Sequence, residues 1–370
     1  MKAIGIILAG GNNDYLDSLT ERRAAAAMPV GSCYRAIDFT LSSMSNSGIN
    51  KVAVLTQYNS RSLQDHLISS KWWDFGRKQG GLFVFTPYTS RNDSTWFRGT
   101  ADSIYQNITY LKRSNEPYVV ITSGDTIYKM NYSNVIKYHI EKKSDITIIY
   151  KNMKDKDLSK FGILELDDDN RLQEFEEKPL QAQSSDASLG IYVISRTLLI
   201  NLLERIIPEQ RYDIVKDIII RFRKELKIYG YEFNGYWSSI SGSIKDYFDT
   251  NMSFLDRDVR EIFTKNAPFV ETKPKDEPPA KYNSGAQVND AIIGSGSILN
   301  GIVEHSVIFR KVYTGENSII KNSIIMEGSY IGNNCVVENA ILDKDVVLSD
   351  GKTIIGEGEN PIIIKKGSVI

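Results

Sequence analysis

The sequence predicts an α/β sheet domain followed by a parallel β-helix. Through about residue 255, short apolar runs suited to buried strands alternate with helical patterns. Beyond residue 285, apolar pairs recur every five or six residues or multiples of that, a period that belongs to neither a helix nor a simple hairpin. Between these regions, residues 264–284 contain four prolines among charged residues, which predicts a linker or an extended crossing segment.

These observations set the expected domain bounds. We expect an α/β domain over 1–262, a proline-rich linker over 263–284 and a β-helix over 285–370. Runs that are apolar throughout are typical of parallel strands buried on both faces. The runs expected to form the sheet are IGIILA at 4–9, KVAVLT at 51–56, YVVIT at 118–122 and DITIIY at 145–150.

One helix of the α/β domain is well marked by its apolar stripe. Ile104, Ile108 and Leu111 recur at i, i+4 and i+7, which places them on one helical face. Thr100 or Asp102 is a suitable cap for the start of this helix. We therefore expect a helix from about residue 100 to 111.

The C-terminal region carries the repeat. Its apolar pairs are Ile292-Ile293, Ile298-Leu299, Val307-Ile308, Ile319-Ile320, Ile324-Ile325, Val336-Val337, Ile341-Leu342 and Val346-Val347. Glycine and asparagine lie between the pairs, at positions suited to corners. This pattern matches the hexapeptide parallel β-helix, in which each coil stacks on its neighbours, so we expect subunit contacts at its open ends.

Composition and charge exclude several classes of function. With 45 basic and 46 acidic residues the chain has no global field to recruit nucleic acid or an anionic membrane. Cys33 and Cys335 form no metal-ligand spacing, which fits a reducing compartment. The sequence contains neither a secretory signal pattern nor an 18-residue apolar run. We therefore expect a cytoplasmic protein with no nucleic-acid or membrane partner.

The opening of the chain has the outline of a phosphate-binding site with altered residues. AIGIILAGG at 3–11 predicts a buried strand that runs into a Gly-Gly turn, and LTERR at 19–23 is expected to open a helix toward a bound phosphate. The glycines are followed by Asn12-Asn13-Asp14-Tyr15, and Arg23 by four alanines, where triphosphate chemistry favours glycine, arginine and lysine. This pattern predicts a modified or regulatory enzyme subunit.

Long stretches of the chain carry a resemblance to a known family. They are LAGG at 8–11, LTERRAAAAMPVGSCYRAIDFTLSSMSNSGI at 19–49, TQYNSRSLQDHL at 56–67, WFRGTADSIYQN at 96–107, SGDTIYKMNY at 123–132, FGILELDDDNRLQEFEEKP at 161–179 and ASLGIYVISRTLL at 187–199. The chain resembles the bacterial ADP-glucose pyrophosphorylase (glucose-1-phosphate adenylyltransferase) family, and its departures resemble the GlgD-type regulatory subunit. The resemblance implies a Rossmann-like nucleotidyltransferase domain followed by a left-handed β-helix.

The resemblance implies a reaction and a metal. The phosphate of glucose 1-phosphate attacks the α-phosphorus of ATP, with Mg²⁺ bridging the reacting oxygens, to give ADP-glucose and pyrophosphate. Asp125, which follows the strand YVVIT, is similar to the metal-binding aspartate of the family, although such an aspartate is otherwise a common turn residue. The second family carboxylate, in a GYW-x-D pattern, corresponds to Ser239, a poor ligand for a hard dication. Mg²⁺ is therefore expected to bind weakly or not at all.

The same comparison implies that the triphosphate anchors are lost. The family arginine after the glycines corresponds to Tyr15, a loop glycine to Asn13 and the lysine after Arg-Ala to Ala25. Removing one preorganised electrostatic contact typically costs about 10²- to 10³-fold in rate, although such losses are not additive within one unit. Almost no turnover is therefore expected. The remaining nucleotide-side positions implied by the resemblance are Gly10, Gly11, Gly99, Thr100 and Asp102.

The sugar-phosphate positions of the family are better preserved. Glu177-Lys178 matches a Glu-Lys-Pro motif in which glutamate accepts sugar hydroxyls and lysine neutralises phosphate, although a solvated surface pair is the alternative. Gly162 and Ser188 match further sugar-contacting positions. Asp217 matches an acid near the sugar, and a helix-capping or solvated role is equally consistent with its sequence context.

Four hypotheses follow. The first is a non-catalytic or weakly catalytic regulatory subunit in glycogen synthesis that binds a catalytic subunit in a heterotetramer, with glucose 1-phosphate and ATP as ligands. The second is a self-sufficient nucleotidyltransferase in which Asp14 or Asp17 replaces a lost ligand. A third is an acyltransferase with His305 as base, although His66, His139 and His305 form no cluster in the sequence. A pure sugar-phosphate sensor overlaps with the first.

Overall fold

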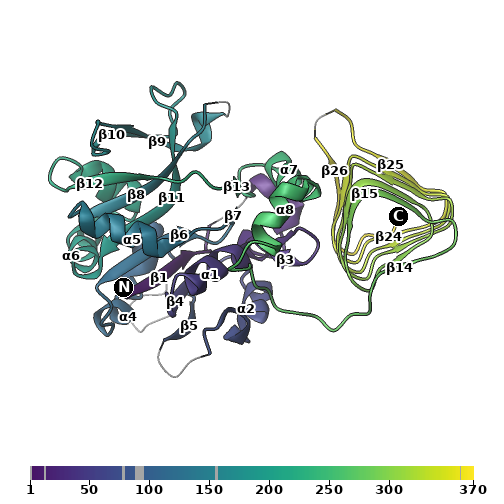
Figure 1. Cartoon of the computed structure of the whole chain (residues 1–370), viewed down its shortest axis with the longest axis horizontal. Helices are drawn as coiled ribbons and strands as arrows, with labels where there is room; N and C mark the ends of the chain where they lie inside the picture. Colours follow the sequence, from purple (N-terminus) through teal and green to yellow (C-terminus); the bar gives the residue numbers. More distant parts are fainter. Residues whose placement is uncertain (1, 12–13, 77–79, 88–95, 155–156, 359) are drawn as a thin grey trace.

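The computed structural model describes residues 2–11, 14–76, 80–87, 96–154, 157–358 and 360–370. A sheet domain with helices on both faces leads into a triangular β-helix (Figure 1). The predicted architecture, a Rossmann-like α/β domain followed by a parallel β-helix, is confirmed. No helix in the described part of the chain is long and apolar enough to cross a membrane.

The central sheet is mixed rather than parallel throughout. Its strands are β1 Ala3–Leu8, β4 Lys51–Leu55, β5 Gly81–Phe85, β6 Tyr118–Ser123, β8 Ile146–Asn152, β9 Gly162–Leu166, β10 Leu172–Glu177, β11 Asp186–Ser195 and β12 Ile228–Glu232. The order is β10-β9-β11-β6-β1-β4-β5, and β8 pairs with β11 and β12. The four predicted apolar runs are all strands. The runs at 118–122 and 145–150 differ from the parallel expectation on one side, because β6 and β8 are each antiparallel to β11 and parallel to their other neighbour.

Helices cover both faces of the sheet. They are α1 Ala36–Asn46, α2 Arg61–Leu67, α3 Thr100–Tyr105, α4 Ile108–Lys112, α5 Tyr132–Glu141 and α6 Arg196–Ile206. Two more helices, α7 Ile244–Met252 and α8 Arg257–Thr264, lie between the sheet and the β-helix (Figure 1). Leu41 of α1 and Ile136 of α5 belong to the apolar core on one face. Leu111 of α4 and Leu203 of α6 belong to the core on the other face. Two apolar layers therefore hold the sheet rigid beneath the loops at its carboxyl edge.

The predicted helix over 100–111 is present as two short helices, α3 and α4. Ile104 and Leu111 are buried and Ile108 is half-buried, so the apolar stripe was predicted correctly. The predicted cap was wrong. Gly99 is the N-cap and has no side chain to cap the helix, while Thr100 and Asp102 lie inside the first turn. The Asp102 carboxylate accepts a hydrogen bond from the Arg98 backbone N–H at 2.9 Å instead.

The opening segment differs from its prediction. β1 is present, but Asp14–Thr20 forms 3₁₀ turns that are kinked at Asp17, rather than a helix that begins at LTERR. The kink arises because Asp17 has a positive φ of 46°. A 3₁₀ segment with such a break cannot align its N–H groups as a helix N-terminus does. The expected helix opening toward a phosphate is therefore absent from the described part of this loop.

After α8 the chain crosses to the β-helix along the sheet domain. Residues 265–280 contain neither helix nor strand, and β14 at Lys281–Tyr282 already pairs with the β-helix. The Glu271 backbone N–H donates to Ser42 at 2.8 Å, and Thr272 donates to Asp38 at 2.5 Å. The crossing segment is thereby held against α1. The domain bounds given above remain a prediction.

The C-terminal region forms three rows of stacked parallel strands. These strands are β14, β15 Gln287–Ile293, β16 Ile298–Leu299, β17 Ile302–Ile308, β18 Tyr313–Thr314, β19 Ile319–Lys321, β20 Ile324–Ile325, β21 Tyr330–Ile331, β22 Val336–Glu338, β23 Ala340–Leu342, β24 Val347–Leu348, β25 Thr353–Ile355 and β26 Ile362–Ile364. Each predicted apolar pair lies in or overlaps one of them. Ile302 pairs with Ile319 and Ile319 with Val336, so a coil closes where the sequence period predicts.

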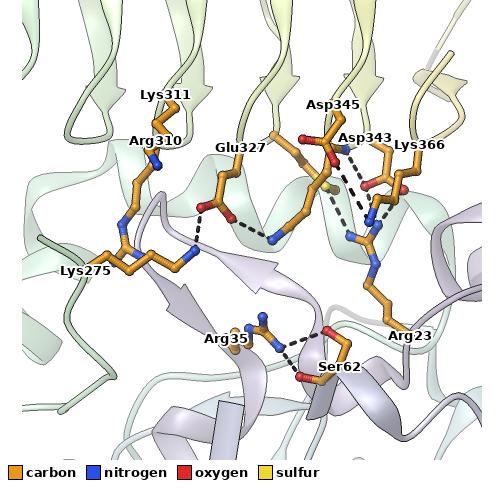
Figure 2. Close-up of polar contacts among 12 residues, drawn as sticks. Arg23, Arg35, Ser62, Lys275, Arg310, Lys311, Glu327, Asp343, Asp345 and Lys366 are labelled. Carbon is orange, nitrogen blue, oxygen red and sulfur yellow. Dashed lines mark hydrogen bonds and ion pairs between the residues drawn. The ribbon is translucent and has the colours of Figure 1, made fainter. Parts of the chain in front are cut away.

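One face of the β-helix packs on the sheet domain. Val307, Ile324 and Ile341 share an apolar core with Tyr247 and Phe248 of α7. Polar contacts extend this interface. Figure 2 shows the Arg23 guanidinium reaching Asp343 and Lys275 reaching Glu327. The two N–O distances between Arg23 and Asp343 are 2.6 and 2.7 Å, and Glu327 also accepts a hydrogen bond from Lys344. The two domains therefore share a continuous interface.

A buried histidine links the stability of the sheet domain to pH. His139 is 2% exposed, and its Nδ1 lies 2.8 Å from the Thr147 hydroxyl. Burial lowers its pKa to about 4, with a smaller opposing effect of Asp145. Below about pH 6.5 the unfolded chain binds a proton that the folded chain excludes. The free energy of unfolding therefore decreases as the pH is lowered from about 6.5 to about 4.

We expect this group to remove up to about 3 kcal/mol from the free energy of unfolding between pH 6.5 and 4. Chemical denaturation across this range measures the effect. In the His139→Gln variant, which has no titrating ring, the decline should be shallower. An unchanged slope in the variant would mean that other groups cause the acid sensitivity.

Candidate active site

Two adjoining cavities lie at the carboxyl edge of β1 and β6. The first, of about 330 Å³, is called the alanine cavity and includes Ala9, Ala25 and Ala26 in its lining. The second, of about 270 Å³, is called the hydroxyl cavity, and its lining hydroxyl groups come from Ser123, Thr126, Ser188, Tyr192, Ser239 and Ser241. Open α/β sheets bind ligands at this edge. Asp125, Glu177 and Tyr192 line both cavities.

Asp125 lies between the two cavities. It follows Gly124 at the end of β6 and precedes β7 at Thr126–Tyr128, so its backbone belongs to a strand junction. The Ser123 hydroxyl donates a hydrogen bond to its carboxylate. Its backbone carbonyl accepts from Ile240 N–H at 3.2 Å, which ties it to the segment after β13. The structure therefore holds this predicted carboxylate in the lining shared by both cavities.

Ser239 lies beside Asp125, where the family carboxylate was expected. β13 at Trp237–Ser239 is antiparallel to β7, and its register places Ser239 opposite Thr126. The Ser239 hydroxyl lies 3.2 Å from the Ser241 hydroxyl. No group of three or more His, Cys, Asp or Glu side chains is placed to hold a metal among the described residues. Ser239 offers a neutral hydroxyl where the family pattern has a second carboxylate, so this position is poorer in the charged oxygen ligands that hold Mg²⁺.

The residues expected to hold a triphosphate do not provide positive charge. Ala25 lines the alanine cavity, and Asn13 falls outside the described residues. Tyr15 is 71% exposed and lies in a third cavity, of about 810 Å³, together with Ser239 and Lys178. Arg23 is 5% exposed and its guanidinium is engaged by Asp343 of the β-helix (Figure 2). None of the described residues that line the alanine cavity is lysine or arginine.

The predicted nucleotide-side residues divide into two groups. Gly11 and Thr100 line the alanine cavity. Gly10 lies beside it, and its carbonyl accepts a hydrogen bond from the Gln57 amide at 2.9 Å. Gly99 is required by packing, because a Cβ there would lie 2.4 Å from the Tyr212 carbonyl oxygen. Asp102 is fully buried and bonds to Arg98 and Gln106, so its observed contacts are structural.

The predicted sugar-phosphate residues are largely brought together. Gly162, Glu177, Lys178 and Ser188 all line the hydroxyl cavity. Burial raises the pKa of the Glu177 carboxyl, and the neighbouring Lys178 opposes this shift. Asp217 does not line either cavity; its carboxylate accepts the backbone N–H groups of Tyr212 and Asp213 at 2.9 Å. The capping interpretation of Asp217 therefore matches its contacts.

Sequence reasoning missed several lining residues. Asp213 lines the alanine cavity and accepts a hydrogen bond from Thr100 at 3.3 Å, and Trp237 lines the hydroxyl cavity. The GYW motif contains Trp237, so this position had a signal that was used only for Ser239. Asp213 lies four residues before Asp217, and the sequence alone did not indicate which of them lines the cavity.

The remaining candidates lie elsewhere. His66 pairs with Asp38 at 2.6 Å, and His305, on an exposed part of the β-helix, pairs with Asp290 at 2.6 Å. Asp14 and Asp17 are exposed and do not contribute to the lining of either cavity. The structure thus gives no support to Asp14 or Asp17 as replacement ligands.

Comparisons with known proteins agree with this architecture. Residues 4–257 match the model of the family described as Nucleotidyl transferase, and residues 278–361 match that described as GlmU-like, C-terminal hexapeptide. A protein of Bacillus cereus (strain ATCC 14579) named Glucose-1-phosphate adenylyltransferase is 39% identical over 363 residues, which cover 97% of this chain and 96% of the relative.

Two further relatives carry the same name. The protein of Fusobacterium nucleatum is 40% identical over 86% of this chain and 83% of its own length. The protein of Geobacillus stearothermophilus is 37% identical over 86% of this chain and 82% of its own length. Together with the matching domain models and the site at the carboxyl edge of the sheet, these similarities establish that the chain belongs to the glucose-1-phosphate adenylyltransferase family of nucleotidyl transferases.

Proposed function

We propose that this chain is a regulatory subunit of glucose-1-phosphate adenylyltransferase with little or no turnover of its own. It assembles with a catalytic subunit into a cytoplasmic heterotetramer and modulates the formation of ADP-glucose from ATP and glucose 1-phosphate in glycogen synthesis. The relatives named above carry this enzyme name. The main observation behind the proposal is that the side chains described in the lining of the alanine cavity include acidic residues but no basic ones.

The alanine cavity is suited to exclude a triphosphate. Three carboxylates, of Asp125, Glu177 and Asp213, contribute to its lining, whereas no basic side chain is described there. Transfer of a nucleotidyl group brings two anions together, so catalysis depends on positive charge that neutralises them. Like charges close together in a cavity of low dielectric constant repel strongly. ATP is therefore expected to bind weakly, and the chemical step to lack its electrostatic stabilisation.

The hydroxyl cavity supports retention of the sugar phosphate. Lys160 and Lys178 line it and offer positive charge to a phosphate. Glu177 and Ser188 line it and offer hydrogen bonds to sugar hydroxyls. A subunit that binds one substrate without converting it offers a ligand site separate from the catalytic one, which coupling between subunits requires.

The alternative is a self-sufficient nucleotidyltransferase with altered metal and phosphate ligands. One observation favours it, since Asp213 adds a carboxylate to the cavity that Asp125 lines. This alternative requires turnover by the isolated chain, and it requires that turnover to be lost in Asp125→Ala.

Pyrophosphate release by the purified chain tests the proposal. With ATP, glucose 1-phosphate and Mg²⁺, we expect no release above that of the Asp125→Ala variant. Release that depends on Asp125 would overturn the proposal and establish the alternative.

The assembly is tested separately. An intact catalytic subunit from the same organism, mixed with this chain, is expected to form a complex with the mass of a tetramer in light scattering. The Vmax of the catalytic subunit or its KM for glucose 1-phosphate should change in the complex. A catalytic subunit that neither binds this chain nor changes its kinetics would contradict the regulatory role.

A further inference from the structure

A cavity between the sheet domain and the β-helix is lined largely by basic side chains. It has a volume of about 210 Å³ and is called the interdomain cavity. Its basic residues come from the sheet domain, the crossing segment and the β-helix, and they are Arg35, Lys273, Lys275, Arg310 and Lys344. Among the residues described in its lining, only Asp65 and Glu327 carry a carboxylate. Like charges gathered in a partly buried cavity repel, so this interface needs negative charge.

The coil repeat places Glu327 between two of these bases. Strand β20 pairs with β17, and β23 pairs with β20. Arg310, Glu327 and Lys344 each lie two residues after one of these strands, so they take equivalent positions on successive coils. Figure 2 shows Arg310 and Glu327 extending from the β-helix toward the sheet domain. The repeat therefore presents one acid within a column of bases at the domain interface.

Glu327 joins the crossing segment to the β-helix through two ion pairs. Its carboxylate accepts hydrogen bonds from Lys275 at 2.5 Å and from Lys344 at 2.8 Å, and its side chain is 21% exposed. Burial opposes its ionisation, but Lys344 and Lys275 outweigh this effect and lower the pKa of the Glu327 carboxyl to about 2. The carboxylate is therefore charged at neutral pH and neutralises lysines from two segments at once.

The other three cationic groups have backbone carbonyl groups as partners. These hydrogen bonds run from Arg35 to Ser62 at 2.6 Å, from Lys273 to Asp65 at 3.2 Å and from Arg310 to Cys33 at 3.2 Å. Every basic side chain described in the lining thus has an oxygen acceptor within the chain. The Asp65 side chain belongs to an exposed residue, where solvent screens its charge. Glu327 is therefore the main source of negative charge inside the cavity.

We infer that Glu327 is an internal counter-ion of the interdomain cavity. Its carboxylate takes the place that a free anion such as phosphate would otherwise fill, and it keeps the two domains joined without one. A free anion binds Lys275 and Lys344 only by displacing this carboxylate, which is part of the same chain and so has a high effective concentration. The inference concerns the interface between the domains and does not depend on the proposed regulatory function.

Thermal unfolding of Glu327→Gln with and without phosphate tests this inference. Glutamine keeps the shape but leaves Lys275 and Lys344 without a counter-ion, so the melting temperature should fall by about 3–6 °C. Inorganic phosphate at about 20 mM, with ionic strength held constant by chloride, should restore most of this loss because it binds the folded state at the vacated position. The parent should gain less than about 1 °C from the same phosphate.

Glu304→Gln is the matched control. Glu304 pairs with Lys321 at 3.0 Å on an exposed part of the β-helix and does not line the interdomain cavity. Its substitution changes the net charge equally, and the melting temperature should stay within about 1 °C of the parent in either buffer. If phosphate stabilises the parent as much as Glu327→Gln, the cavity binds a free anion beside Glu327 and the inference is wrong. It is also wrong if phosphate does not restore Glu327→Gln, or if that variant is as stable as Glu304→Gln.

A double variant keeps the test decisive if Glu327→Gln does not fold. In Glu327→Gln, Lys275→Gln one cation is removed together with the carboxylate, so repulsion among the remaining cations is weaker and the chain should fold. Lys344 still lacks its counter-ion in this variant, and phosphate should raise the melting temperature by more than it does in the parent. A gain no larger than that of the parent would overturn the inference.

Discussion

Replacing Asp343 with asparagine is expected to lower the free energy of unfolding by about 3–5 kcal/mol. Asp343 is 1% exposed and Arg23 is 5% exposed, and both carboxylate oxygens accept from one guanidinium nitrogen, at 2.6 and 2.7 Å. The substitution leaves the arginine charge buried without a counter-charge, which costs far more than the pair itself contributes. Urea denaturation of the full chain measures the loss.

Replacing both partners provides the control for this prediction. In the double variant Arg23→Met, Asp343→Leu no charge is left buried, so its stability should return to within about 1–2 kcal/mol of the parent. The exposed pair Lys365–Glu21, at 2.7 Å, joins the same two domains, and Lys365→Met should change stability by less than about 1 kcal/mol. Equal stability of Asp343→Asn and the parent would show that water reaches the pair.

The Arg23–Asp343 pair also connects the β-helix to the alanine cavity. Arg23 precedes the 3₁₀ turn at Ala25–Ala27, and Ala25 and Ala26 line that cavity. The Ala24 backbone N–H donates to the Asn59 carbonyl at 3.2 Å, so the segment is held at both ends. The pair therefore joins the β-helix to the segment that lines the alanine cavity.

The β-helix and the sheet strands could be predicted because their signals are local. Pairs such as Ile319-Ile320 and Ile324-Ile325 repeat with the period of a coil, and every coil buries the same side, so the pattern directly reflects the structure. The run at 145–150 likewise predicted a strand, but not its antiparallel partner β11. Strand direction depends on the crossover connections, which apolar runs do not encode.

The contacts of charged residues could not be predicted, because they depend on partners far along the chain. Arg23 lies in a motif that suggested phosphate, yet its partner is Asp343, 320 residues away. Asp102 and Asp217 matched family motifs, and the structure shows both bonding to nearby backbone groups. A motif places a residue near a site, but only the backbone conformation determines whether its side chain faces the ligand or supports the loop that does.

Adding charge to the two cavities is expected to create activity. The double variant Ala25→Lys, Ser239→Asp should release pyrophosphate at least about 100-fold faster than the parent, since one preorganised electrostatic contact is worth about 10²- to 10³-fold in rate. Ala25→Lys brings a cation into a cavity whose described charges are all acidic, and Ser239→Asp gives Asp125 a second carboxylate as a partner. Pyrophosphate release with ATP, glucose 1-phosphate and Mg²⁺ is the measurement.

Matched variants separate charge from shape in this experiment. Ala25→Met, Ser239→Asp adds a side chain of similar length without charge and should stay as slow as the parent. Adding Asp125→Ala to the active double variant should abolish release, because the carboxylate introduced at position 239 then loses its partner at the end of β6. Tyr15→Arg should add little by itself, since Tyr15 is 71% exposed and lies outside the alanine cavity. If Tyr15→Arg restores release and Ala25→Lys does not, the triphosphate approaches from the surface near Tyr15, and the acidic lining of the alanine cavity is not what prevents turnover.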